Sequence, residues 1–359
     1  MEQHCVPLNF DDPENYPNGN PAAPLNPPGL RNTDSCLSIG ENPVVHDYRS
    51  DGPAPGAIAF RWAYGSVCAA TNTDPDIQII AYNEDTYILR ENVCVHWEAP
   101  FTYLLFGNDG ALLIDTGATE EAEFYPLRKT VDALIARWCK VRRRKDIPLT
   151  VAFTSGEDVA QNKGRKQFSG RANTKIAPVD LVELKAFYGL AAGRAEGMGK
   201  TGRIDLGGRV IEVIATPGTH KDGVSFYDPY NKLLYTGDLF YPGRIQIANL
   251  RDYAASLERL IAWCCAHPVK WVMGGHIEMM FVPGRAYPRF TNYKPYERLL
   301  QMEPALLEDA LTHAKKMPPE GAVITRADFA LLYRVSPDAG IYQVPKDMPD
   351  VPVSFWLPL

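Results

Sequence analysis

Short apolar runs separated by polar turns dominate the middle of the chain and predict β-strands. A first group lies between residues 77 and 114, with turns at 83–85 and 107–110. Its expected strands are 77–82, 86–89, 102–106 and 111–114. A second group follows residue 149 and includes two hairpins, one around Gly207-Gly208 and one across 228–231. Its expected strands are 149–153, 176–179, the two arms of 204–214, 224–227, 232–235 and 269–273.

Helical periodicity appears between these runs and again after them. Residues 120–141 place Leu127, Val131, Leu134 and Trp138 on one face. Shorter helices are expected at 180–188 and 254–265, and residues 293–316 are expected to be mostly helical. Strands mixed with helices in this way predict an α/β fold.

The two ends of the chain differ from this middle part. Residues 1–56 carry a third of the 30 prolines and predict an arm without regular structure, which lies over the body or over a second copy. Plain disorder is the alternative. We therefore divide the chain into a Pro/Asn-rich arm at 1–75, a globular domain at 76–290, and a C-terminal helix with an extended tail at 291–359.

The composition of the chain indicates which binding partners and which cellular compartment to expect. The net charge of −6 gives no reason to expect nucleic-acid binding. No run approaches the ~20 apolar residues that span a bilayer, and the first residues lack the basic and apolar regions of a signal peptide. The seven cysteines are odd in number and form no CxxC pair, which predicts reduced thiols and a cytoplasmic location.

Residues capable of chemistry gather at five points where an expected strand passes into a loop. Separate loops that converge at one edge of a two-sheet body can assemble a site from distant parts of the sequence. The five junctions are 115–117, 155–158, 216–223, 236–238 and 274–276.

Three stretches, LLFGNDGALLIDTG, TPGTHKDGVSFYDPYNKLLYTGDLFY and VMGGH, resemble the metallo-β-lactamase fold hydrolase superfamily in order and spacing. The resemblance covers about residues 83–284. It implies a four-layer αβ/βα sandwich with an active site at one edge between two sheets. The irregular arm and the C-terminal helical extension lie outside this common core. The resemblance also implies that Asp115 supports a neighbouring loop and is not a metal ligand.

The chain departs from this family at the motif Thr-His-x-His-x-Asp-His, which supplies most of the metal ligands. Aligned on Thr154, the first two histidine positions hold Ser155 and Glu157. The motif Asp and last His become Val159 and Ala160. The family's Thr-Pro-Gly-His becomes Thr-Pro-Gly-Thr219, with His220 one residue late.

The family's bridging aspartate and last histidine survive as Asp238 and His276. Because structural and catalytic zinc sites need about four donors, we expect no dinuclear zinc centre and favour a site without a cofactor. The alternative is one divalent ion such as zinc, held by Asp238 and His276 with Asp158.

These residues define the expected site. Without a metal-bound hydroxide, the reaction needs acid–base groups from the protein itself. The expected catalytic residues are Glu157, Asp158, His220, Asp238 and His276. For Glu157 and Asp158, a solvated loop is an equal alternative. The expected substrate-binding residues are His96, Trp97, Thr219, Arg285 and Tyr287, because aromatic and basic groups suit an apolar or anionic small molecule.

Two functional hypotheses follow from the sequence. In the first, the protein is an enzyme derived from a hydrolase and acts on a small ester, lactone, thioester or related molecule. In the second, it is a non-catalytic relative that binds a small ligand or a partner protein. The expected partner is a small-molecule substrate or ligand, and the arm is the candidate surface for contact with a second copy.

Overall fold

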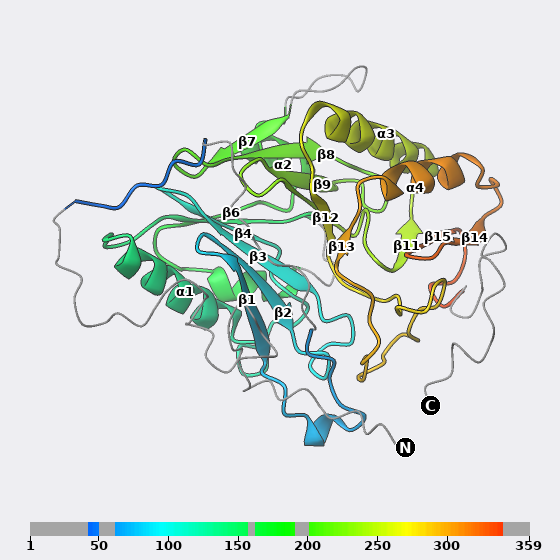
Figure 1. The fold of residues 1–359 in the computed structure, drawn as a ribbon, viewed down its shortest axis with the longest axis horizontal. Helices are drawn as coiled ribbons and strands as arrows, with labels where there is room; N and C mark the ends of the chain where they lie inside the picture. The colour runs from blue at the N-terminus through cyan, green and yellow to red at the C-terminus, as the bar shows by residue number, and fades with distance from the viewer. Residues whose placement is uncertain (1–41, 50–61, 157–161, 191–200, 340–359) are drawn as a thin grey trace.

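Two six-stranded mixed sheets form the centre of the protein in this computed structural model, which describes residues 42–49, 62–156, 162–190 and 201–339 (Figure 1). The strands of the first sheet follow chain order, and its parallel neighbours are β4 with β5 and β5 with β6. They are β1 (Ile77–Asn83), β2 (Thr86–Glu91), β3 (Phe101–Phe106), β4 (Ala111–Ile114), β5 (Leu149–Ala152) and β6 (Thr174–Ile176).

The second sheet has the order β13-β12-β10-β9-β8-β7, in which β10 and β12 are parallel neighbours. Its strands are β7 (Gly202–Asp205), β8 (Val210–Ala215), β9 (Val224–Asp228), β10 (Leu233–Gly237), β12 (Trp271–Gly274) and β13 (Gln301–Met302). A smaller sheet pairs β11 (Arg244–Ile247) with β15 (Ala330–Tyr333), which in turn pairs with β14 (Ala322–Thr325). The α/β class predicted from the sequence is confirmed.

Helices cover the outer faces of the two large sheets. The buried face of α1 (Leu127–Val141) joins the core of the first sheet, and α3 (Leu250–Ala266) and α4 (Leu306–Lys315) share a second core with the second and third sheets. The short helix α2 (Leu181–Phe187) begins at Asp180, whose carboxylate accepts hydrogen bonds from the amides of Val182 and Glu183. Two 3₁₀ turns, η2 (Ala69–Thr71) and η3 (Lys163–Phe168), complete the described elements.

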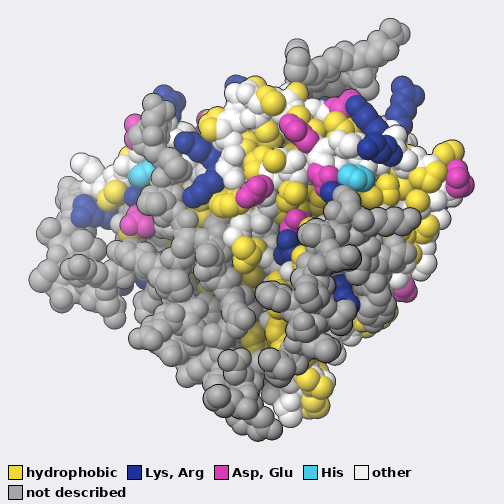
Figure 2. Space-filling model, turned by 45° about the vertical axis from the view of Figure 1, so that its right-hand side comes forward, with side chains coloured by type: hydrophobic (Ala, Val, Ile, Leu, Met, Phe, Trp, Pro, Cys, Tyr) yellow, Lys and Arg dark blue, Asp and Glu magenta, His cyan; other side chains and the backbone are white. Residues whose placement is uncertain are grey.

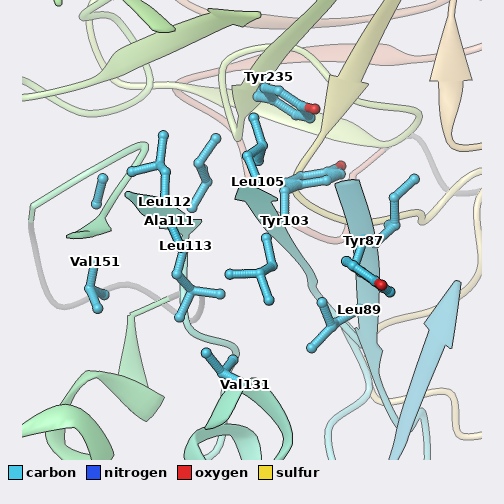
Figure 3. Packing of buried hydrophobic residues seen from close by; sticks show 14 of the residues in the cluster. Tyr87, Leu89, Tyr103, Leu105, Ala111, Leu112, Leu113, Val131, Val151 and Tyr235 are labelled. Atoms are coloured by element: carbon cyan, nitrogen blue, oxygen red, sulfur yellow. The ribbon is translucent and has the colours of Figure 1, made fainter. Parts of the chain in front are cut away.

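The main core fills the space between the two large sheets. Figure 3 shows Tyr103 of β3 pointing toward Tyr235 of β10, while Val131 of α1 lies on the other side of the first sheet. The rings of Tyr103 and Tyr235 are 4.6 Å apart. The hydroxyl of Tyr103 donates to the carbonyl of Gly274 on β12 at 2.6 Å, so the same side chain joins both sheets.

A buried arginine joins the sheets at the end of the core where β10 begins. Arg209 is 1% exposed, and its guanidinium lies 2.5 Å from the carboxylate of Asp228. It also donates to the carbonyls of Asp85 and Phe106 on the first sheet, at 2.7 and 2.8 Å. A buried cation needs such complete pairing, because desolvation is costly for any unpaired charge.

The described part of the N-terminal arm packs on this same end. The amide of His46 donates to the side chain of Asn108 at 2.9 Å. The ring of Tyr48 lies 5.0 Å from the ring of Tyr230 and 5.7 Å from the guanidinium carbon of Arg209. Further along, Trp62 is buried against Phe101 with ring centroids 4.6 Å apart. The arm therefore packs on the globular domain both at residues 46–48 and at Trp62.

The expectation of a mostly helical segment at 293–316 is wrong for its first half. Helix α4 begins only at Leu306, and residues 301–302 form β13 beside β12. Pro295 and Pro304 cannot donate backbone hydrogen bonds and so oppose a helix through this segment. In the Pro-rich tail after Met317, β14 and β15 form a hairpin, and the extended apolar end expected at 351–359 lies outside the described residues.

The surface in the described part of the chain is mixed in character. In Figure 2, basic and acidic side chains lie interspersed with hydrophobic ones over the described part of the face. Within the described ranges, no helix is long and apolar enough to cross a membrane.

Replacing Arg209 with Met should lower the free energy of unfolding by about 3–5 kcal/mol, because the carboxylate of Asp228 would stay buried without its cation. Urea denaturation measures this loss. The matched control is Arg203→Met on β7, where the arginine is 70% exposed and pairs with Glu212. Its cost should stay below about 1 kcal/mol. Equal costs for both variants would contradict this role of Arg209.

Candidate active site

The residues capable of chemistry follow the carboxyl ends of parallel strands in the two large sheets. The carboxyl ends of β4 and β5 lead to Asp115 and Thr154, and those of β10 and β12 lead to Asp238 and His276. Ligand sites of open α/β sheets lie at such carboxyl ends. The four junctions therefore meet where the two large sheets approach each other.

Two residues hold these junctions together. The carboxylate of Asp115 accepts hydrogen bonds from the amide and the hydroxyl of Thr154, at 2.8 and 2.9 Å. Gly237 has a φ of +52°, and a Cβ there would lie 2.2 Å from the hydroxyl oxygen of Thr154. Only glycine allows this close approach. The supporting role expected for Asp115 thus has a direct structural basis.

Asp238 follows this glycine and lies between two imidazole rings. Its Oδ1 is 3.3 Å from Nδ1 of His276, and its Oδ2 is 3.6 Å from Nε2 of His220. His276 comes from the end of β12, where the amide of Gly275 donates to the carbonyl of Gly237. His220 comes from the loop between β8 and β9, where the amides of Gly218 and Gly223 bond to its carbonyl.

The row of charges continues beyond His276. Nε2 of His276 lies 3.6 Å from Oε1 of Glu278, and Oε2 of Glu278 accepts from the backbone amide of Arg244 at 2.8 Å. The guanidinium Nε of Arg244 is 3.2 Å from the same oxygen. Side chains of His220, Asp238, His276, Glu278 and Arg244 therefore form a row in which imidazole or guanidinium groups alternate with carboxylates.

This row perturbs the protonation of its members. Burial alone would lower the pKa of His276, but hydrogen bonds with Asp238 and Glu278 outweigh it and raise that pKa to about 10. Burial likewise favours a high pKa for Glu278, yet His276 and Arg244 lower it to about 2. His220 and His276 hold the pKa of Asp238 below its usual range against the effect of burial. His276 is thus a cation between two carboxylates at neutral pH.

The row borders a cavity of about 220 Å³. Glu98 also borders it, and burial raises the pKa of this carboxyl, with the charges of Asp238 and Glu278 acting in the same direction. The lining residues are Trp97, Glu98, Thr219, His220, Asp238, Tyr241, Arg244, Gln246, His276, Glu278, Arg289 and Pro337.

The structure brings together part of the site expected from the sequence. His220, Asp238, His276, Thr219 and Trp97 all border this cavity. His96 lies beside it, 3.9 Å from the carboxylate of Glu98, and burial lowers its pKa to about 4.

Other expected residues lie elsewhere. The side chain of Arg285 is exposed, and Tyr287 is buried with its hydroxyl accepting from the amide of Tyr296; neither borders the cavity. Glu157 and Asp158 fall outside the described residues. The interpretations of these two residues as catalytic groups, or of Asp158 as a ligand, therefore stay predictions.

Sequence reasoning missed Glu98, Arg244 and Glu278. One available signal was the spacing of His276 and Glu278, because residues two apart in an extended segment point to the same side. Arg244 had no comparable signal, because it reaches Glu278 only through the fold of β11.

The described donors do not fit a zinc centre as they stand. Zinc binds the lone pair of an imidazole nitrogen, but both ring nitrogens of His276 face carboxylates. Ser155, at the first histidine position of the family motif, donates its hydroxyl to Asp222 at 2.9 Å. Within the ranges that the structure describes, no group of three or more His, Cys, Asp or Glu side chains has a metal-holding arrangement.

Comparisons with known proteins find similarity over part of the chain. Residues 157–296 match the family profile described as the metallo-beta-lactamase superfamily. Over 94 residues the chain is 32% identical to the acyl-coenzyme A thioesterase MBLAC2 of Gallus gallus and 30% identical to that of Homo sapiens. These alignments cover 25% of this chain and 34% and 33% of the thioesterases, so the chain spans about a third of the length of the curated relatives it matches. A metallo-beta-lactamase structure from Pontibacter korlensis has a TM-score of 0.43 at 17% identity, over 67% of this chain and 100% of that chain.

Replacing His276 with Gln should destabilise the fold more at pH 6 than at pH 10. A histidine whose pKa rises from 6.5 to about 10 on folding stabilises the folded state fully below pH 6.5. That contribution disappears as the pH rises from 6.5 toward 10, so the wild type should approach the variant there. Chemical denaturation of both proteins at several pH values measures the difference. A difference that stays constant over this window would contradict a charged His276.

Proposed function

The chain carries a domain of the metallo-beta-lactamase superfamily, and we propose that it hydrolyses a small ester or thioester with acid–base groups of its own. The proposal places the reaction in the cavity at the sheet edge, within the four-layer αβ/βα frame expected for residues 76–290. The observation that carries it is the position of Asp238 between His220 and His276 at the border of an open cavity. The site would work without a dinuclear zinc centre.

In the proposed reaction, His220 is the general base. Its Nε2 faces Asp238, so Nδ1 takes a proton from the attacking water, and the carboxylate stabilises the imidazolium that forms. The pKa of Asp238 is held low, so that carboxylate stays ionised through the reaction. His276 and Glu278 keep Asp238 in position from the other side.

Glu98 is the proposed general acid. Its pKa is raised by burial, and within the described chain its Oε2 is buried with no hydrogen-bond partner. A carboxyl whose pKa is raised keeps its proton to higher pH than an ordinary glutamate and can protonate the departing alkoxide or thiolate. The water oxygen then forms the new bond to the carbonyl carbon, and the alcohol or thiol leaves with the proton from Glu98.

A thioester is the favoured substrate class among esters, lactones and related molecules. Support comes from the partial similarity to proteins named as acyl-coenzyme A thioesterases. That similarity covers a quarter of this chain. Thioesters are therefore proposed as the substrate class, and their hydrolysis is compared below with that of a simple ester.

Steady-state hydrolysis of S-butyryl-N-acetylcysteamine and of p-nitrophenyl butyrate tests the proposal. Asp238→Asn and His220→Gln should each lower kcat by at least about 100-fold, the usual size of a general acid–base contribution. Matched controls are Asp132→Asn on α1 and His313→Gln on α4, which lie outside the cavity and should retain wild-type rates.

Two results would overturn this function. Full activity in Asp238→Asn would place the chemistry elsewhere. Folded wild-type protein that hydrolyses none of a panel of esters and thioesters would favour the alternative of a non-catalytic protein that binds a ligand or partner.

A further inference from the structure

The cavity beside Asp238 is too small for a whole substrate of ordinary size. Its volume of about 220 Å³ lies below the roughly 300–1,000 Å³ of pockets that enclose drug-sized ligands. A substrate with its carbonyl near Asp238 must therefore extend past the rim. The side chains at that rim then contact the part of the substrate that does not react.

Trp97 and Arg289 border the cavity, and the ring of Phe290 lies next to both of them. The ring centroids of Trp97 and Phe290 are 5.4 Å apart. The guanidinium carbon of Arg289 lies 5.4 Å from the centre of the Trp97 ring and 5.2 Å from that of Phe290. Arginine held by aromatic faces keeps its planar edge of N–H donors available for an anion.

Arg289 differs from the other cationic or imidazole side chains that border the cavity. Arg244 pairs with Glu278, and both histidines face Asp238. For Arg289, the described part of the chain provides no carboxylate within ion-pair distance. A half-buried guanidinium without a carboxylate, at the mouth of a cavity, is suited to bind an anionic group of a ligand.

The loop that carries Arg289 is held at both ends. Ala286 pairs with Met279 on one side, and Tyr293 pairs with Gly65 of the N-terminal arm on the other. Between these anchors Phe290 has a φ of +64° and is 69% exposed. A bulky residue in this conformation is strained, and such strain concentrates at functional sites. The backbone thus holds an aromatic ring in the open beside Arg289.

We propose that Arg289 is a specificity-determining residue that binds an anionic group on the part of the substrate outside the cavity. Trp97 and Phe290 provide the apolar surface next to that group. The anion is a carboxylate or a phosphate, joined by several bonds to the carbonyl that reacts near Asp238. This inference rests on the proposed function for the position of that carbonyl.

Two matched pairs of thioesters test the inference on the full chain. The first compares glutaryl with glutaramoyl thioesters of N-acetylcysteamine, which differ by a carboxylate on the acyl side. The second compares butyryl thioesters of 4′-phosphopantetheine and pantetheine, which differ by a phosphate on the thiol side. The wild type should prefer the anionic member of at least one pair by about tenfold or more in kcat/KM. The pair that shows the preference identifies the kind of anion.

Arg289→Gln should abolish this preference by lowering kcat/KM for the preferred anionic member to the value for its neutral counterpart. Arg289→Lys should retain part of it, because a lysine keeps the charge without the planar pair of donors. The matched control is Arg334→Gln, since Arg334 also lies over an aromatic ring, 5.1 Å from the centre of Tyr333, but does not border the cavity. It should keep the full preference.

Calorimetric binding of the same four thioesters to Asp238→Asn separates this inference from the proposed function. Tighter binding of an anionic member, lost on adding Arg289→Gln, supports the role of Arg289 even if no thioester is hydrolysed. Turnover of neutral and anionic members at equal rates with equal affinities would overturn the role of Arg289 and leave the hydrolase intact. Loss of the preference in Arg285→Gln, with Arg289→Gln unchanged, would also overturn it.

Discussion

The carboxylate of Asp238 requires a hydrogen-bond donor on each side, and the arrangement of this end of the molecule follows from that requirement. A charge largely removed from water is costly unless it is paired. His276 faces it from β12 and His220 from the loop before β9. Glu278 and Arg244 then complete the row on the far side of His276. Three parts of the chain, around residues 220, 238–244 and 276–278, must meet for these contacts to form.

The backbone makes this meeting possible at one point between the sheets. The close contact of Gly237 with Thr154 sets the distance between the ends of β10 and β5. Asp115 fixes the position of Thr154 by accepting two hydrogen bonds from it. At the other end of β10, Arg209 and Asp228 form a second charged contact between the sheets. The apolar core thus lies between two polar clusters, one of which borders a cavity.

Much of this could be predicted from the sequence, and the rest could not for identifiable reasons. Alternating apolar runs and the turn at Gly207-Gly208 determine the hairpins locally, so those strands were predicted well. The third sheet was missed because β11 pairs with β15, which is far away in sequence and only four residues long. Since Arg244 belongs to β11, its contact with Glu278 could not be predicted either. Motif order located Asp238, His220 and His276, but their mutual geometry depends on the register of β10 and β12.

Under the proposed function, this site acts through protein side chains and not through a dinuclear metal centre. The direct measurement is elemental analysis of the full chain purified without added metal, joined to thioester turnover of the same sample before and after exhaustive chelation. We expect less than one zinc per chain and a turnover rate that chelation leaves unchanged. Two zinc ions per chain, with turnover that chelation abolishes and added zinc restores, would contradict it.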